Sequence, residues 1–196
     1  MDDLSFVVEW LPTLPALETL CLGHGMLDHL PAPIPHDCLR HVSFDTFLMS
    51  AEEVTLLLDW TCGLVRLEHI SFRNIYLGEG PRASMQRALR HWFSRANITY
   101  VRLACCDLDE DAVADVASAL GSSTWPLALD LVQNDQLDLQ GACRLLDALA
   151  PLATCTLRVT LVAKDRNEIL SYAHQLPMII DDSGDDEYTF FSGGRV

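Results

Sequence analysis

The chain has 196 residues, 49% of them hydrophobic, which is enough apolar material to bury a core as one domain or as one continuous stack of small units. It carries 13 basic and 28 acidic residues, a formal net charge of -15. This balance leaves no basic field for a nucleic-acid backbone or an anionic membrane surface, so we expect neither as a partner.

The cysteine usage and the first residues indicate the compartment. The seven cysteines are odd in number and show no CxxC spacing, which favours reduced, buried thiols. The chain begins MDDLSFVVEW, with acidic residues where a secretory signal carries basic ones, and no apolar run approaches the length of a membrane span. We therefore expect an intracellular protein, cytoplasmic or nuclear.

In chain order, the first predicted element covers residues 1–16. Residues 4–16, LSFVVEWLPTLPA, have the composition of a helix end and are broken at Pro12. We interpret residues 1–16 as an N-terminal helical cap or as the remnant of a preceding repeat.

A repeated apolar pattern then occupies residues 17–176. Its order is apolar, two free, apolar, one free, apolar, two free, a small or polar residue, one free, apolar, as in ITYVRLACCDL at 98–108 and LETLCLGHGML at 17–27. The first apolar slots fall at residues 17, 39, 67, 98, 126 and 154. Spacings in the twenties and low thirties are typical of a solenoid, in which units stack along one axis.

The central apolar-free-apolar trio of each unit predicts a short strand with one face in the core and the other exposed. One unit cannot bury its apolar face alone, so successive trios are expected to pair as a parallel sheet. We expect the side chains of one slot to form a single interior row: Leu22, Phe44, Phe72, Leu103 and Leu131.

Helices are predicted in the second half of most units, over residues 50–63, 81–94, 109–121 and 138–151, with a last helix over 164–176. Ser50 with Glu53 forms a capping-box pattern, and Asp138 is a second N-cap candidate. The first unit differs, because residues 28–38 hold three prolines and predict an extended or turn-rich return.

This pattern resembles the leucine-rich repeat, in the ribonuclease-inhibitor-like (RNI-like) branch. The resemblance implies an α/β fold, a curved solenoid of about five to six units with a parallel sheet on the concave face and helices on the convex face. It also implies an asparagine or cysteine after each strand, hydrogen-bonded to backbone. Here that slot reads Gly25, Phe47, Ile75, Cys106, Asn134 and Val162, so we expect backbone or water to satisfy most of these turns.

The last segment, residues 177–196, is predicted to be an acidic, flexible C-terminal tail. The stretch DDSGDDE at 181–187 packs five acids into seven residues, and glycines follow it.

Catalytic and metal chemistry find little support in the sequence. Cys21, His24, His36 and Cys38 have irregular spacing, and the Cys105–Cys106 pair is better explained by core packing. We find no GxSxG elbow, phosphate loop or HExxH motif. We therefore expect no enzyme, no cofactor and no metal, and an enzyme of unknown type is kept only as an unlikely alternative.

The free residues of the strands are the first candidate surface. Tyr, His and Arg are common anchors of protein interfaces, and His41, His69 and Tyr100 share one column of the expected sheet. The alternative is an ordinary solvated sheet face. The predicted partner-binding residues are His41, Asp45, His69, Arg73, Tyr100, Arg102, Asp130 and Gln133.

A second candidate surface lies on one predicted helix. Residues 65–100 carry six arginines and two acids in an otherwise acidic chain. Either these arginines offset neighbouring acids, or they dock an acidic peptide, including the chain's own tail. The residues are Arg82, Arg87, Arg90 and Arg95.

We therefore predict a non-catalytic module that binds a protein partner through the concave face, as a scaffold or an inhibitor. Many intracellular members of the resembling family are substrate receptors of ubiquitin ligases, which implies an alternative: an F-box-type receptor lacking its F-box, with a ligase adaptor as partner through the missing region.

Overall fold

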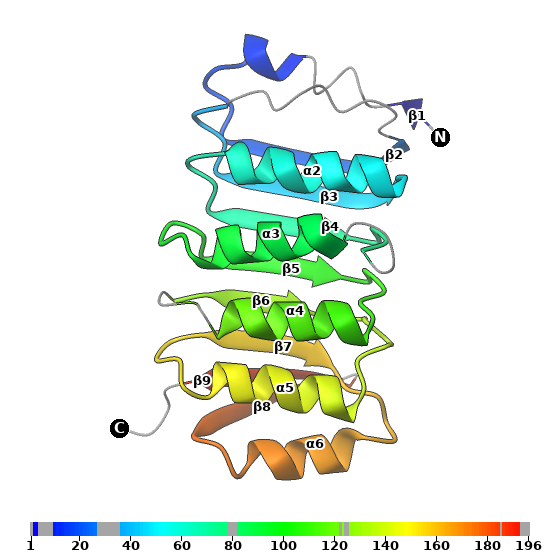
Figure 1. Ribbon diagram of the computed structural model, residues 1–196, viewed down its shortest axis with the longest axis vertical. Helices are drawn as coiled ribbons and strands as arrows, with labels where there is room; N and C mark the ends of the chain where they lie inside the picture. The colour runs from blue at the N-terminus through cyan, green and yellow to red at the C-terminus, as the bar shows by residue number, and fades with distance from the viewer. Residues whose placement is uncertain are drawn as a thin grey trace.

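The apolar trios form neighbouring strands of one sheet, as the computed structural model of the chain shows (Figure 1). The structure describes residues 2–3, 10–26, 36–77, 82–121, 123, 126–184 and 186–192. The strands are β1 (Asp2–Asp3), β2 (Thr19–Met26), β3 (His41–Leu48), β4 (His69–Arg73), β5 (Tyr100–Ala104), β6 (Ala128–Leu131), β7 (Thr156–Thr160), β8 (Met178–Gly184) and β9 (Glu187–Ser192). The helices are η1 (Leu11–Thr13, a 3-10 turn), α2 (Ala51–Gly63), α3 (Arg82–Phe93), α4 (Glu110–Leu120), α5 (Leu139–Leu149) and α6 (Arg166–Ala173).

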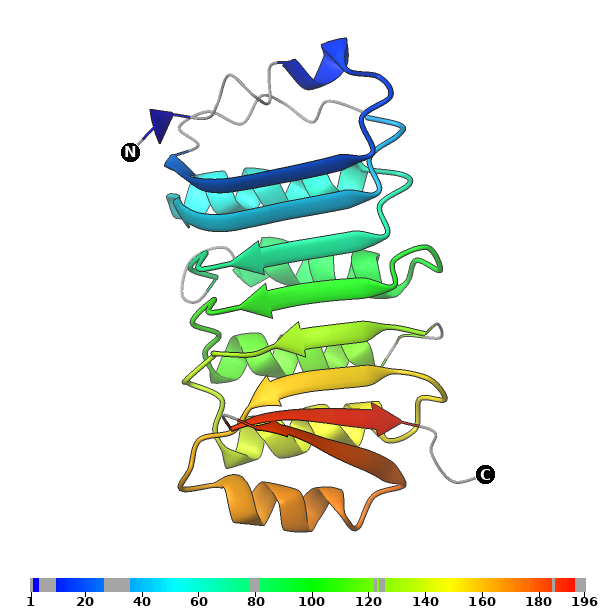
Figure 2. The ribbon, with the colours of Figure 1, turned by 180° about the vertical axis from the view of Figure 1, so that it is seen from behind.

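Within the described residues the sheet order is β1-β2-β3-β4-β5-β6-β7-β9-β8. Strands β1 to β7 pair in parallel, and β9 pairs antiparallel with both β7 and β8. Helices α2 to α6 lie on one face of the sheet, and Figure 2 shows the opposite face, on which no described helix lies. The predicted α/β class with a mostly parallel sheet is confirmed.

The register of the sheet aligns the same slot of successive units. Phe44 lies opposite both Leu22 and Phe72, and Phe72 lies opposite Leu103. Leu22 is half-buried, while the side chains of Phe44, Phe72, Leu103 and Leu131 are buried in one core beneath the helices. The predicted interior row therefore exists, and it stacks side chains that no single unit could cover.

The helices begin where their caps predict. The Ser50 hydroxyl accepts a hydrogen bond from the Glu53 amide, and the Glu53 carboxylate accepts one from the Ser50 amide, so α2 starts with a capping box. Asp109 caps α4 and Asp138 caps α5, each through a carboxylate oxygen that accepts an amide hydrogen bond. These caps position each helix directly after its strand.

A left-handed residue follows the trio in five successive units. His24, Thr46, Asn74, Cys105 and Gln133 have φ angles between 52° and 60°. Each stands seven residues after the first apolar slot of its unit, a regularity that the apolar pattern does not reveal. Because few non-glycine residues adopt this conformation, its recurrence at one slot shows that these five turns share one backbone conformation.

The slot that follows the left-handed residue is filled as expected at two positions. Asn134 Nδ2 donates hydrogen bonds to the carbonyls of Leu103 and Leu131 at 2.7 and 2.8 Å, and its Oδ1 accepts from the Cys106 amide at 3.0 Å. Cys106 Sγ contacts the carbonyls of Phe72 and Ala104. Buried Phe47 and Ile75 fill the slot with apolar atoms, and backbone amides such as that of Asn74 bond to the next unit.

The predicted flexible tail over residues 177–196 is wrong for the residues that the structure describes there. Strands β8 and β9 form an antiparallel hairpin, and β9 also pairs with β7. Tyr188 and Phe190 lie opposite Val159 and Leu157 and are buried, so they continue the core rows. Burial of these aromatic side chains outweighs the acidic composition, and residues 193–196 lie outside the described residues.

Only parts of the predicted N-terminal segment 1–16 can be compared. Strand β1 (Asp2–Asp3), which the sequence did not predict, pairs with the end of β2. Leu11–Thr13 forms a 3-10 turn at Pro12, where we expected a helix to break. Residues 4–9 lie outside the described residues, as do residues 28–35 of the proline-rich return.

Candidate functional site

The face of the sheet opposite the helices, which we call the open face, is seen in Figure 2. The register of the sheet places three columns of residues on this face. The first column is Thr19, His41, His69, Tyr100, Ala128, Thr156 and Phe191. The second column is Cys21, Ser43, Ser71, Arg102, Asp130, Arg158 and Thr189. The third column begins Gly23, Asp45, Arg73 and Ala104.

Three rings stack along the first column. The His41 and His69 ring centroids are 4.4 Å apart in an edge-to-face arrangement, and the His69 and Tyr100 centroids are 5.7 Å apart. Partial burial lowers the pKa of His69, and His41 lowers it further, while Glu68 acts in the opposite direction. In this ring column, His41-His69-Tyr100, the lowered pKa of His69 favours its neutral form.

The predicted residues Asp45 and Arg73 form a polar cluster at the strand ends. Asp45 Oδ1 accepts hydrogen bonds from Thr46 Oγ1 at 2.9 Å and from Asn74 Nδ2 at 3.1 Å, and Arg73 lies 3.5 Å from Asp45 Oδ2. Burial alone would raise the pKa of Asp45, but these hydrogen bonds and Arg73 hold it below its ordinary value. The cluster is exposed, so both charges border the open face.

The prediction that Asp130 contacts a partner directly is wrong, because this residue is only 4% exposed. Its register places it on the open face, but its neighbours cover it. Tyr100 donates a hydrogen bond to Asp130 Oδ2 at 3.2 Å, and Arg102 and Arg158 each lie 3.5 Å from the same oxygen. Asp130 therefore holds together the side chains that are exposed around it.

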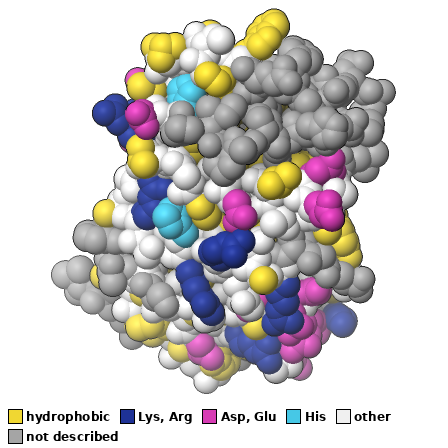
Figure 3. Space-filling view, turned by 45° about the horizontal axis from the view of Figure 1, so that its top comes forward, with side chains coloured by type: hydrophobic (Ala, Val, Ile, Leu, Met, Phe, Trp, Pro, Cys, Tyr) yellow, Lys and Arg dark blue, Asp and Glu magenta, His cyan; other side chains and the backbone are white. Residues whose placement is uncertain are grey.

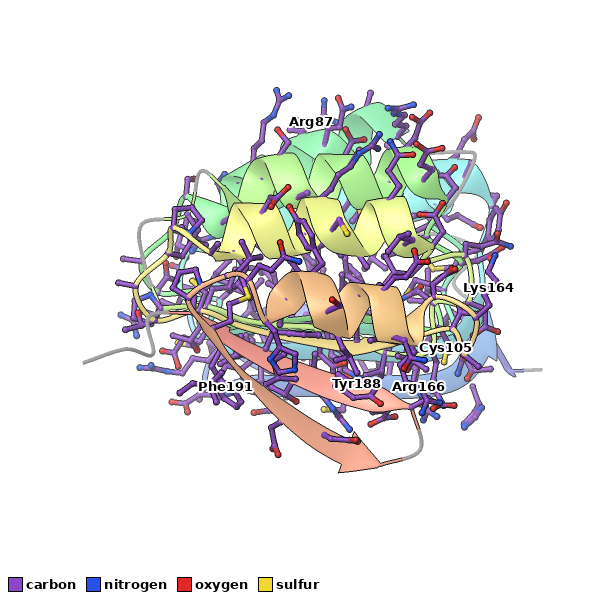
Figure 4. All side chains as sticks on the ribbon, turned by 90° about the horizontal axis from the view of Figure 1, so that it is seen from below. Arg87, Cys105, Lys164, Arg166, Tyr188 and Phe191 are labelled. Carbon is purple, nitrogen blue, oxygen red and sulfur yellow. The ribbon has the colours of Figure 1, made fainter. Side chains whose placement is uncertain are left out.

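Gln133 is exposed, as predicted, but it lies in the turn after β6 rather than among the three columns. Its amide donates a hydrogen bond to Thr160 Oγ1 at 2.9 Å, and its side-chain carbonyl accepts one from Cys105 Sγ at 3.0 Å. This edge of the molecule, where the parallel strands end, also carries Lys164 and Arg166 (Figure 4).

The sequence analysis missed the part of the open face that belongs to β7 and β9. Arg158, Thr189 and Phe191 extend the first and second columns, and Glu187 forms an ion pair with Arg158. The alternation of Tyr188 and Phe190 with these residues was the available signal for a strand. The acidic residues before it led us to predict a tail.

The second candidate surface does not form one free basic patch. Arg82 forms ion pairs with Asp111 and Asp115 of α4, and Arg87 forms one with Asp59 of α2 at 2.9 Å. Arg95 donates hydrogen bonds to the Val65 carbonyl and to Asn97. Among the described residues Arg90 has no ion pair. Figure 3 shows basic and acidic side chains side by side in this region, an arrangement in which the arginines offset neighbouring acids.

The groups considered for metal or thiol chemistry are not brought together. In the part of the chain that the structure describes, no three His, Cys, Asp or Glu side chains are grouped so that they could hold a metal ion. Burial raises the pKa of Cys106 to about 12 and that of Cys62 to about 11, so both thiols stay protonated at neutral pH. None of the described helices combines the length and the apolar character needed to cross a membrane.

No protein-family model matches the chain, and no curated protein matches it either.

Proposed function

We propose that this chain is a leucine-rich-repeat-like module of the RNI-like kind that binds a protein partner, without catalysis, through the open face. The left-handed residue at one slot of five units and the buried Asn134 after β6 support the repeat assignment. The ring column, exposed on a face that no described helix covers, is the observation that carries the binding role.

The charge distribution of the open face supports a protein partner. Among its described residues four acidic side chains stand beside three basic ones: Asp45, Asp130, Asp181, Glu187, Arg73, Arg102 and Arg158. The face therefore carries little net charge in a protein of net charge -15. Interface centres are depleted in unpaired charge and enriched in Tyr and Arg, and this face has both properties.

A photo-crosslinking experiment tests the proposal. A photoreactive amino acid replaces Ser43 or Ser71 on the open face, and in control proteins it replaces the exposed helical residues Leu56 or Ala83. We expect one common partner to be crosslinked from positions 43 and 71 and not from positions 56 and 83. The same products from all four positions, or products from the helical positions alone, would refute the assignment.

The ring column supplies the second half of the test. A His69→Ala, Tyr100→Ala protein that carries the crosslinker at position 43 is expected to lose most of the product, because it lacks two of the proposed anchors. Arg90→Ala on α3 is the matched control and is expected to leave the yield unchanged.

A further inference from the structure

Arg102 has hydrogen-bonding capacity that the chain does not use. Its only ionic contact in the described residues is Nε to Asp130 Oδ2 at 3.5 Å, and Nε is buried without a hydrogen bond there. About 31% of its side chain is exposed. Arg158, by comparison, also forms an ion pair with Glu187. The Arg102 guanidinium therefore retains a fork of donors that can bind a carboxylate in bidentate geometry.

Asp130 cannot occupy the unused hydrogen-bond donors of Arg102. One of its oxygens, Oδ2, already serves Tyr100, Arg102 and Arg158, and the other accepts a hydrogen bond from the Val132 amide at 3.2 Å. The carboxylate is buried between these groups and has no second position from which to approach Arg102 more closely. A carboxylate that comes from outside the chain has access to the exposed side of Arg102.

Two aromatic side chains of the first column lie on either side of a space beside Arg102, which belongs to the second column. Here two small side chains, Ala128 and Thr156, separate the ring of Tyr100 from the ring of Phe191. Because neighbouring strands are about 4.8 Å apart, the two aromatic residues are separated by about 14 Å along the column. Phe191 projects from β9 on the side of the molecule opposite Arg87 of α3 (Figure 4).

We propose, building on the proposed function, that the open face recognises an extended partner segment with an acidic residue two positions from an aromatic residue. The acidic side chain pairs with Arg102, and the aromatic ring lies over Ala128 and Thr156 between Tyr100 and Phe191. Residues i and i+2 of an extended segment project to the same side about 6.6 Å apart. The diagonal from Ala128 to Arg102 is about 8 Å by the same strand dimensions, and the long arginine side chain spans the remaining difference.

The net charge of -15 does not conflict with an acidic side chain at this position. Long-range repulsion acts mainly on the rate of association, whereas a charge-assisted pair acts after contact. Next to Arg102 the second column holds Arg158 and the buried carboxylate of Asp130, and Glu187 pairs with Arg158, so the charges of this part of the face nearly balance. A side-chain carboxylate is favoured over a C-terminal carboxylate, because it can reach Arg102 while the backbone of the partner segment stays above the side chains of the open face.

A short peptide tests the proposal directly. The probe is the acetylated and amidated peptide Ser-Glu-Ser-Phe-Ser, titrated into the full chain and followed by NMR chemical shifts. We expect shifts at Ala128 and Thr156, and an affinity about tenfold lower for the peptide in which Gln replaces Glu, since a charge-assisted bond is lost. Replacement of the peptide Phe by Ala is expected to remove the shifts at Ala128 and Thr156.

Protein variants complete the test. Arg102→Lys keeps the charge next to Asp130 but removes the fork, and Ala128→Leu fills the space between the rings; both are expected to weaken binding about tenfold. Arg73→Lys changes an arginine of the same face that already pairs with Asp45 and is the matched control. Thermal unfolding verifies that each variant is folded.

Failure of this inference is distinguishable from failure of the proposed function. If the probe does not bind, or binds equally well to Arg102→Lys and to the unmodified chain, the inference is overturned. Crosslinking of a partner from positions 43 and 71 would then still support the open face as a binding surface. The absence of such crosslinking would overturn the proposed function independently of the peptide.

Discussion

Asn134 shows how one polar side chain can connect two units of this protein. It is almost fully buried, and its four hydrogen bonds reach the carbonyls of Leu103 and Leu131 and the amides of Cys106 and Leu108. Leu103, Cys106 and Leu108 belong to β5 and the turn after it, whereas Leu131 ends the next strand, β6. Asn134 therefore satisfies backbone groups that the turn leaves without partners and that water does not reach.

Replacement of Asn134 by Ala is expected to destabilise the protein by about 3 kcal/mol or more, because each buried backbone group left without a partner costs about 1–3 kcal/mol. Asn167→Ala is the control, since Asn167 is exposed on α6, and its loss should cost less than about 1 kcal/mol. Urea unfolding of both variants measures the difference. Equal losses would show that Asn134 does not connect the units.

His69 makes stability depend on pH. Its pKa in the folded chain lies below the ordinary value of 6.5, mainly through burial, so the unfolded chain binds more protons between the two values. The contribution is complete above pH 6.5 and is lost as the pH falls from 6.5 through the folded-state pKa. Burial lowers the pKa of His91 as well, with the same sign.

We therefore expect the free energy of unfolding to decrease between pH 7.5 and 5.5, and to decrease less in His69→Gln than in the unmodified chain. Urea unfolding at both pH values measures this. Ser71→Ala changes the same face without removing a titrating group and should retain the full decrease. A variant His69→Gln with an unchanged pH dependence would contradict the assignment.

At the scale of the element, the repeated pattern predicted strands β2 to β7, their register and the helices α2 to α6. Ile70, for example, pairs with Val42 and Val101 as the shared slot requires, and Ser50 and Asp138 cap helices where predicted. These features depend on local periodicity and capping, which a sequence displays directly.

Two features of the candidate site could not be predicted in the same way. The burial of Asp130 depends on Arg158, a residue that lies 28 positions away and joins it only in the assembled sheet. The β8–β9 hairpin depends on the free edge of β7, which accepts an antiparallel strand because no further parallel unit occupies it. The acidic composition of this segment alone favoured a tail, because composition carries no information about the pairing of Phe190 with Leu157.

The two faces of β9 allow a matched prediction. Phe190→Ala is expected to cost about 3–5 kcal/mol, because Phe190 is fully buried opposite Leu157. Phe191→Ala, one residue later and on the open face, should cost no more than about 1 kcal/mol. Thermal unfolding of both variants compares them, and similar losses would show that the hairpin does not close the core.

At the scale of the whole molecule, polar contacts between helices connect neighbouring units. Polar bridges join successive helices: Asp59 of α2 to Arg87 of α3, Arg82 to Asp115 of α4, Glu110 to Arg144 of α5, and Asp147 to Tyr172 of α6. Together with the core rows, these contacts connect each unit to the next one along the chain. The proposed repeat architecture implies that the stability is approximately a sum of terms for the units and for the interfaces between them.

This arrangement predicts a gradient of hydrogen exchange along the sheet. Amides of β4, β5 and β6 have a paired strand on each side and helices above the buried face, so their exchange requires the opening of two interfaces. Amides of β8 have one neighbouring strand, and Leu22 of β2 is only half-buried. Exchange followed by mass spectrometry should be slowest in the peptides that contain β4 to β6 and faster toward β2 and β8. Uniform protection across all strands would instead show that the molecule unfolds as one cooperative body, and its stability could then not be divided among units.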